Sequence, residues 1–529
     1  MARRSLRDIF VRKSVEQMHD EHEHGELKRS LGATNLVLLG IGCIIGTGIF
    51  VLTGRAAAQF AGPAIIISFI ITGTLCALVA LSYAELSSAI PVSGSAYSYS
   101  YASLGEIAAW IMGVLLVLEY GLAASTVAVG WSGYVASFLH DLGMDIPPSL
   151  RGAPGTPVTD FVTGAVVGTG VVNLPAVIGI VAVTGLLILG VSESAFVNNI
   201  VVAIKVTVVV AFIAIGAFYV NPDLWSPLVP QAVPPPPVEQ GLWSEIGTAL
   251  WAVVTAQNTG QYGVAGIITA AATIFFAYIG FEAVSTAGAE SRNPSRDMPI
   301  GIIGSLIICT ILYILTSAVL VGIVPYTDLN DAAPIAKAVN QIGLPWFAVL
   351  VKIGAIAGLS SVMLVLLYGQ TRIFYTMARD GLIPPVFAQV HPKFKTPWIN
   401  TLIVGVLAFG FAGFMGLDEL ANLTNIGTLL AFAIVCLTVV YLRIARPDMK
   451  RPFRTPLFPF TPVLGALMCL FLLMSLMARE TTRNFFLVYL AGGIVLYFAY
   501  GMWNSKLGKG VVVRGHEVLA ESPHQKGLD

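Results

Sequence analysis

The sequence contains few charged residues for its length. Only 11% of its 529 residues are Asp, Glu, Lys or Arg, and 56% are hydrophobic, whereas a soluble domain has about 25% charged residues. A chain with so little charge cannot cover the surfaces of several soluble domains. Its 29 basic residues are balanced by 29 acidic ones, so it lacks the basic excess typical of nucleic-acid-binding proteins. The composition therefore indicates a polytopic membrane protein.

Motifs for metal binding and covalent chemistry are also lacking. None of the five cysteines (Cys43, Cys76, Cys309, Cys436 and Cys469) has CxxC spacing, which excludes a recognisable metal site or disulfide framework. There is no nucleotide-binding loop and no Ser–His–Asp set, so we expect neither a cofactor, a metal nor an enzyme. The first thirty residues are charged and have no apolar core, so no cleavable signal peptide is expected.

Long apolar segments dominate the remainder of the chain. A membrane-crossing helix needs about 20 mostly apolar residues, and about twelve segments meet that length criterion. Membrane β-strands would instead alternate apolar and polar residues. The predicted spans are 35–58, 63–90, 105–139, 173–191, 197–219, 266–290, 300–323, 345–378, 398–416, 423–443, 458–478 and 485–504.

The basic residues indicate the orientation of these spans. With the N-terminus in the cytoplasm, 22 of the 29 Lys and Arg residues fall on the cytoplasmic side and 5 outside, in accord with the positive-inside rule. The other two, Lys205 and Lys352, lie within spans. We therefore expect a multi-pass protein of the cell membrane with both termini in the cytoplasm.

Glycines interrupt two of the spans. Four lie within nine residues of the first span, at Gly40, Gly42, Gly46 and Gly48, and the sixth span contains Gly280 followed by Glu282. Each glycine costs ~1 kcal/mol relative to alanine in a helix interior. The clusters therefore favour helix breaks, with close helix packing as the alternative. Interrupted segments at corresponding positions of two halves indicate a transporter site. Exposed N–H groups attract a carboxylate and exposed C=O groups an ammonium, so two adjacent breaks would bind an α-amino acid.

Ordered sequence blocks at these positions carry a family resemblance. They are GIGCIIGTGIFVLTG (40–54), SYAELSSAIPVSGSAYSYSY (82–101), EYGLAASTVAVGWSGY (119–134), FFAYIGFEAVSTAGAESRNPSRDMP (275–299), YGQTRIFYTMARDGL (368–382) and NLTNIGT (422–428). From about Leu31 to Tyr500, the chain resembles the amino acid–polyamine–organocation superfamily, and within it the bacterial relatives of the cationic amino acid transporters.

The resemblance implies an all-α fold with a leucine-transporter-like core. In that fold a five-plus-five inverted repeat, with helices 1 and 6 broken, is followed by two additional helices, which agrees with about twelve spans. The expected parts are a cytoplasmic arm (1–30), a transport core (31–444), two further transmembrane helices (445–504) and a cytoplasmic tail (505–529).

The resemblance also implies the residues of the substrate site. The substrate carboxylate should meet N–H groups near Thr47 and Gly48, and the Thr47 hydroxyl is a further donor. The ammonium should meet carbonyls of Ile44, Phe276, Ala277 and Ile279, with the Phe276 ring as an outward gate. Gly42, Gly46 and Gly280 support the breaks.

Lys205 is the most unusual residue of the spans. A lysine at a helix centre costs ~2.5–3.5 kcal/mol on insertion scales, and snorkelling towards an interface is the alternative. In proteins that this chain resembles, a lysine here replaces a sodium ion and reaches carbonyls near Gly42, beside hydroxyls such as Ser360 or Ser361. A buried lysine can lose and regain its proton, so the coupling ion is expected to be a proton, with no sodium site.

Other acidic and basic residues lie within or beside the spans. By resemblance, Glu119 shapes the site and contributes to the recognition of cationic side chains, with a structural acid as the alternative. Glu282 would orient the sixth-span break or meet a distal amine of the substrate. We interpret Lys352 as snorkelling to the external interface. We interpret Glu85 and Glu106 as solvated acids that flank a cytoplasmic loop, with a role in gating as the alternative.

Together these features predict a permease that imports cationic or small neutral L-amino acids by alternating access with proton coupling. An exchanger of amino acids or amines without net proton coupling, and a sensor that binds amino acids without moving them, are the alternatives. The bilayer is the expected surrounding, nucleic acid is not a partner, and a small single-helix partner cannot be read from the sequence.

Overall fold

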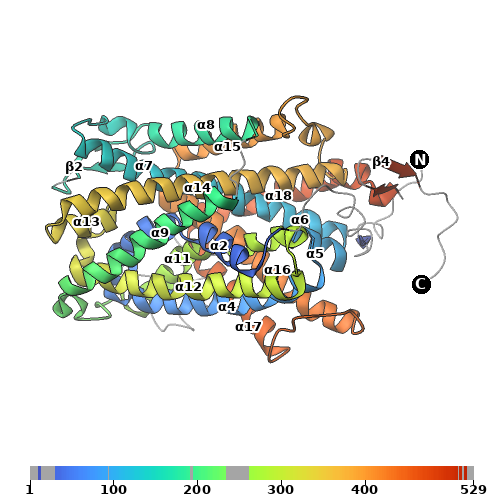
Figure 1. Cartoon of the computed structure of the whole chain (residues 1–529), viewed down its shortest axis with the longest axis horizontal. Helices are drawn as coiled ribbons and strands as arrows, with labels where there is room; N and C mark the ends of the chain where they lie inside the picture. Colours follow the sequence, from blue (N-terminus) through green and yellow to red (C-terminus); the bar gives the residue numbers. More distant parts are fainter. Residues whose placement is uncertain are drawn as a thin grey trace.

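The computed structural model describes residues 10–13, 30–92, 94–161, 163–190, 195–233, 261–509, 511–514 and 517–520. Most of the expected N-terminal arm and the end of the expected C-terminal tail lie outside these ranges, as does much of the loop before the sixth span. Long helices run along one common axis, and α4, α12 and α14 extend over most of its length (Figure 1). The short helix α5 lies at one end of this bundle and α13 at the other (Figure 1).

The helices follow the predicted spans closely. They are α2 (Ala33–Ile44), α3 (Thr53–Ala56), α4 (Ile65–Ala89), α5 (Ser95–Ser103), α6 (Glu106–Leu116), α7 (Ala123–Asp141), α8 (Leu174–Ile188), α9 (Ala195–Gly216), α11 (Gly263–Ile274), α12 (Pro294–Ile323), α13 (Pro334–Gln341), α14 (Pro345–Arg379), α15 (Trp398–Phe414), α16 (Leu417–Ala445), α17 (Phe460–Met477), α18 (Glu480–Leu496) and α19 (Met502–Asn504).

Among the described residues, nine helical stretches are long and apolar enough to cross a membrane. Three further apolar helices, α2, α8 and α15, are only 12, 15 and 17 residues long. Helix length therefore does not establish that the chain crosses the membrane twelve times. The first span falls short because it is interrupted after Ile44, and the helical stretch that follows continues to Ala89. The inverted repeat stays a prediction.

Small antiparallel hairpins lie outside the bundle. Strands β1 (Pro157–Thr159) and β2 (Val166–Thr169) pair with Pro157 opposite Thr169 and Val158 opposite Gly168. Near the end of the chain, β3 (Val511–Arg514) pairs with β4 (Glu517–Ala520). Neither hairpin contributes to the centre of the bundle.

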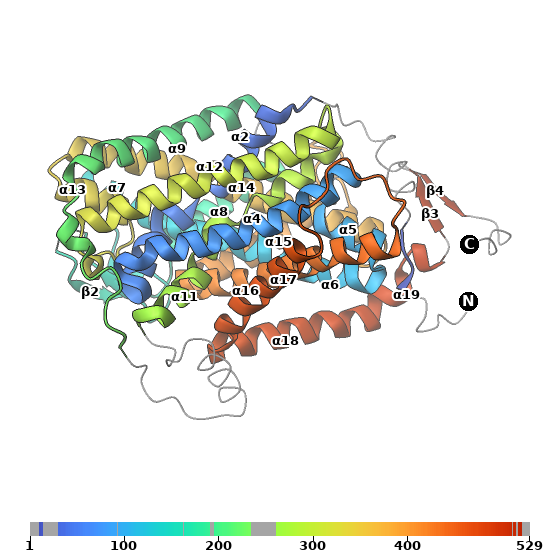
Figure 2. The ribbon, with the colours of Figure 1, turned by 90° about the horizontal axis from the view of Figure 1, so that it is seen from below.

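Packing separates the helices into a core and a periphery. Helix α12 packs along α4 and α2, α14 along α7, and α15 along α8. Helix α18 runs along one edge of the molecule (Figure 2). It exposes large apolar residues such as Val488 and Val495, as a helix that faces lipid would. The buried interior, by contrast, contains many polar side chains, among them Thr47, Lys205 and Glu282 near the interruptions in the first and sixth spans.

Candidate transport site

The first span is interrupted at Ile45 and Gly46. Helix α2 ends at Ile44, and Ile45 is extended with ψ 97°. The chain resumes at Thr47 and forms a π-helical turn, η2 (Gly48–Leu52). Because the last carbonyls of a helix have no intrahelical partner, this interruption exposes backbone acceptors in the middle of a buried segment.

The sixth span is interrupted at Ile279 and Gly280. Helix α11 is followed by a 3-10 turn, η9 (Phe275–Tyr278), and then by an extended Ile279 with ψ 131°. Gly280 has φ +124°, a conformation that favours glycine. The chain continues as a nine-residue 3-10 helix, η10 (Glu282–Glu290).

The two breaks touch each other. A Cβ atom added to Gly48 would lie 2.1 Å from the Ala277 Cα, and one added to Gly280 would lie 2.7 Å from the Cys43 carbonyl carbon. Larger residues at either glycine would separate the two segments. Both interruptions expected from the glycine clusters are thus present, and they lie side by side in the interior.

Lys205 lies against the first break. It is 0% exposed, and its Nζ donates to the Gly42 carbonyl at 2.5 Å and to the Ile45 carbonyl at 3.2 Å. Its aliphatic chain crosses Gly358 of α14, where an added Cβ would lie 2.9 Å from the lysine Cγ and Cδ. The expected contact with a carbonyl near Gly42 is present, and a snorkelling side chain is excluded.

Other side chains hold carbonyls at the first break and in the helix that precedes the second. The Tyr313 hydroxyl of α12 donates to the Ile44 carbonyl at 2.7 Å. The Asn425 amide of α16 donates to the carbonyls of Ala272 and Thr273 at 2.8 and 3.0 Å. Neither residue has a predicted role, since a tyrosine or an asparagine within an apolar span does not indicate which distant carbonyl it contacts.

The remaining predicted residues of the substrate site are buried. Thr47 is 0% exposed and packs against Gly130 of α7, and its hydroxyl has no hydrogen-bond partner among the described residues. Phe276 and Ile279 each retain 6% exposure. Ser360 accepts a hydrogen bond from the Trp131 indole at 3.0 Å, whereas the Ser361 hydroxyl has no partner within the described ranges.

Two buried carboxyl groups meet beside the second break. Glu119 lies on η5 (Val117–Leu122), a π-helical turn between α6 and α7. It is close enough to Glu282 for the two carboxyl groups to interact. Glu282 accepts a hydrogen bond from the Gly280 N–H at 2.8 Å through one oxygen. Its other oxygen, and both oxygens of Glu119, have no hydrogen-bond donor in the described part of the chain.

Tyrosines and a glutamine extend this polar group. Tyr83 of α4 and Tyr120 of η5 lie near both carboxyl groups, and Gln370 of α14 lies beside Gly121. Their polar side-chain atoms are buried without hydrogen-bond partners among the described residues. We call Glu119, Glu282, Tyr83, Tyr120 and Gln370 the polar chamber. Its groups can hydrogen-bond a ligand, because buried polar atoms are normally paired.

The interpretation of Lys352 as snorkelling is wrong. This lysine is 2% exposed, and its Nζ contacts the Asp141 carboxylate at 2.5 Å and the Ser137 carbonyl at 3.2 Å. It contributes to a cavity of about 170 Å³ at the α13 end, together with His140, Asp331 and Lys337. The carboxylate partner explains why the lysine need not reach solvent.

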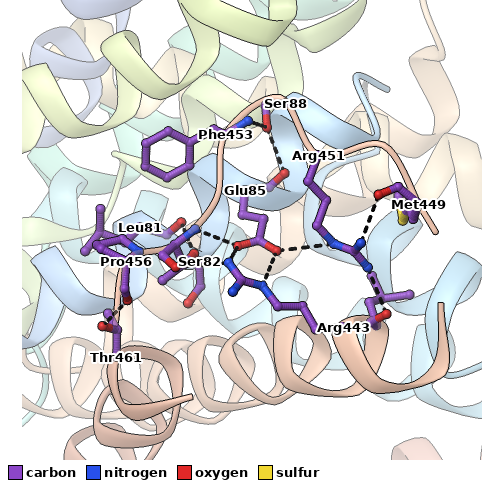
Figure 3. Close-up of polar contacts among 12 residues, drawn as sticks. Leu81, Ser82, Glu85, Ser88, Arg443, Met449, Arg451, Phe453, Pro456 and Thr461 are labelled. Carbon is purple, nitrogen blue, oxygen red and sulfur yellow. Dashed lines mark hydrogen bonds and ion pairs between the residues drawn. The ribbon is translucent and has the colours of Figure 1, made fainter. Parts of the chain in front are cut away.

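The interpretation of Glu85 and Glu106 as solvated acids is also wrong. Glu85 is 3% exposed and joins α4 to Arg443 of α16 through two hydrogen bonds of 2.9 and 2.5 Å (Figure 3). Arg451 (Figure 3) and the Thr455 N–H, both in the loop before α17, contact the same carboxylate. Glu106 is 0% exposed and accepts hydrogen bonds from three side chains: Tyr101, Tyr497 and Ser505.

Comparisons with known proteins agree with this arrangement. The family model described as "Amino acid permease" matches residues 31–499. The chain is 44% identical over 504 residues to the methylthioribose transporter of Bacillus subtilis, covering 95% of this chain and all of that protein. It is also 44% identical over 509 residues to the branched-chain amino acid permease BcaP of the same organism, covering 96% of this chain and 98% of that protein.

A plant protein is more distantly similar. Cationic amino acid transporter 4 of Arabidopsis thaliana is 37% identical over 446 residues, covering 84% of this chain and 68% of that protein. With nine membrane-length helices among the described residues, these matches indicate an integral membrane transporter rather than an enzyme. The chain therefore belongs to the amino acid permease family of the amino acid–polyamine–organocation superfamily.

Proposed function

We propose that this protein imports L-amino acids across the plasma membrane by alternating access, coupled to protons through Lys205. The observation that carries the proposal is the contact between two broken helices, together with the buried lysine on carbonyls of the first break. Unpaired backbone groups at membrane depth are tolerated only where they line a cavity or are otherwise satisfied. Amino acid transport is also the activity that the family supports.

The broken segments supply the receptor for the α-amino acid group. The substrate carboxylate meets N–H groups at Thr47 and Gly48, and the substrate ammonium meets carbonyls of Ile44, Phe276, Ala277 and Ile279. The residual exposure of Phe276 and Ile279 supports this placement, because most of the surrounding residues are less accessible. Phe276 then covers the substrate on the outward side.

Lys205 couples binding to protonation. Protonated, it joins α9 to the first break through the Gly42 and Ile45 carbonyls. Deprotonated, it carries no charge to hold these dipoles, and the first break can move relative to α9. The ammonium takes the place that a sodium ion would need, so transport is independent of sodium.

The polar chamber selects the substrate side chain. Two buried carboxyl groups disfavour a branched apolar side chain, because their polar atoms would be left unpaired. They favour an ammonium or guanidinium group, and the chamber also accepts small neutral substrates that leave room for water. The relatives bear the names of branched-chain, cationic and methylthioribose transporters, so the test must include all three classes.

The experiment is uptake into proteoliposomes under an inward proton gradient, with and without sodium, after a binding screen across pH. The screen contains arginine, lysine, alanine, leucine and methylthioribose. Proton-driven accumulation of lysine or alanine without sodium supports the proposal. Accumulation that requires sodium contradicts the proposal, and proton-driven accumulation of leucine alone contradicts the selectivity assigned to the polar chamber.

An exchange mechanism without net proton coupling is distinguished from symport by accumulation in empty vesicles. Vesicles preloaded with an amino acid and lacking a proton gradient would exchange it under either mechanism. Only a symporter would also accumulate substrate in empty vesicles when a proton gradient is imposed.

A further inference from the structure

Tyr313 occupies a special position at the first break. The residue is 0% exposed and lies in the middle of α12, and its hydroxyl donates to the Ile44 carbonyl at 2.7 Å. Ile44 is the last residue of α2, so this carbonyl has no intrahelical donor. Lys205 reaches the same break from α9 and holds the neighbouring Ile45 carbonyl. Two helices thus hold adjacent acceptors of one break.

The Tyr313 ring also contacts the second break. Its centroid lies 5.5 Å from that of Tyr278 in η9, in an edge arrangement, and 5.7 Å from that of Phe69 in α4. The Tyr278 hydroxyl donates to the Phe69 carbonyl at 3.0 Å. These three residues form an aromatic triad that joins α4, α12 and the turn before the second break. Through Tyr313, the triad connects both breaks.

A carbonyl oxygen has two lone pairs. Tyr313 donates to one lone pair of the Ile44 carbonyl oxygen, so the other lone pair is available to a ligand. The same hydrogen bond fixes the orientation of the peptide group. A phenol with an ordinary pKa of ~10 keeps its proton over the pH range of transport. This bond therefore persists when Lys205 changes its protonation state.

We propose that Tyr313 is a positioning residue for the substrate ammonium: it orients the Ile44 carbonyl and keeps the two breaks in register. The inference rests on the proposed function, since it assigns the Ile44 carbonyl to the substrate. It separates two tasks at one break. Lys205 sets the proton dependence, and Tyr313 sets the affinity for the α-amino group.

The test compares Tyr313→Phe with a matched control. The variant keeps the ring and the triad and removes only the hydroxyl. Tyr489→Phe removes a comparable hydroxyl, which donates to the Val114 carbonyl at 2.8 Å between α18 and α6, away from the breaks. Thermal melts of both variants establish that each is folded.

We expect Tyr313→Phe to weaken amino acid binding and raise KM by about 5- to 10-fold, as loss of one hydrogen bond predicts. Maximal rate and the pH midpoint of uptake should not change. The corresponding 2-hydroxy acid, which lacks the ammonium, should compete equally well against the wild type and the variant. Tyr489→Phe should leave KM unchanged.

Three outcomes would overturn the proposal. The first is an unchanged KM in Tyr313→Phe, and the second is an equal rise in Tyr489→Phe. The third is a shifted pH midpoint with unchanged affinity, which would assign the hydroxyl to proton coupling. If the wild type binds no amino acid of the screen, the proposed function fails and this inference with it. Binding by the wild type with an unchanged Tyr313→Phe affinity overturns the positioning role alone.

Discussion

Two lysines of this protein are almost fully buried, but they meet different acceptors. Lys352 lies against the Asp141 carboxylate at 2.5 Å, whereas Lys205 donates to carbonyl oxygens at the end of a broken helix. A neutral residue at position 352 would leave the Asp141 carboxylate without its counter-charge. Loss of a proton from Lys205 leaves neutral carbonyls without a donor. Lys352 thus belongs to an ion pair, whereas the contacts of Lys205 support its proposed role in proton coupling.

Removal of the Lys205 amine should have the largest effect. Lys205→Ala leaves the Gly42 and Ile45 carbonyls without this donor, and each unsatisfied group costs about 1–3 kcal/mol. We expect proton-driven accumulation to fall by about 100-fold and its pH dependence to disappear, measured as uptake in proteoliposomes. A variant that retains full proton coupling would refute the role of Lys205.

A fixed positive charge at the same position should separate binding from coupling. Lys205→Arg keeps a cation that can hydrogen-bond carbonyls, but an arginine does not lose its proton in proteins. We expect amino acid binding and counterflow to persist and net accumulation under a proton gradient to be lost. Normal accumulation by this variant would show that deprotonation at residue 205 is not required.

Breaking the Lys352 pair should affect stability rather than coupling. Lys352→Met leaves Asp141, which is 29% exposed, without its partner, and we expect a loss of about 2 kcal/mol and a lower Tm. The double variant Lys352→Met with Asp141→Asn should recover part of that loss. A changed pH profile of uptake in Lys352→Met would contradict this comparison, because it would show that Lys352 also takes part in proton coupling.

A partly exposed ion pair provides the smallest expected effect. Arg55 and Asp418 contact each other at 2.7 Å, with 27% and 31% of their side chains exposed. Because exposed pairs contribute about 0–1 kcal/mol, Asp418→Asn should change uptake by less than about twofold and leave Tm nearly unchanged. A large loss of transport would mean that this pair controls access to the site instead of merely joining two helices.

Local sequence patterns predicted the parts of the structure that depend on neighbouring residues. Helix positions and both breaks follow from apolar length and from glycines in mid-span, and an unusual lysine drew attention to residue 205. The partners of Lys352 and Glu85 could not be predicted in this way, because Asp141 and Arg443 lie 211 and 358 residues away. Tyr313 gave no signal, since an aromatic residue within an apolar span is ordinary.

The cluster around Glu85 also has a consequence for the order of assembly. Glu85 belongs to an early helix, and Arg443 is made 358 residues later, roughly 20 to 70 s at ordinary rates of synthesis. During that interval the acid lacks the arginine that the finished protein provides. The α5 end of the bundle can therefore close only after α16 has emerged. A chain that stops before Arg443 is expected to be degraded rapidly, because its α4 presents an acid without a basic partner.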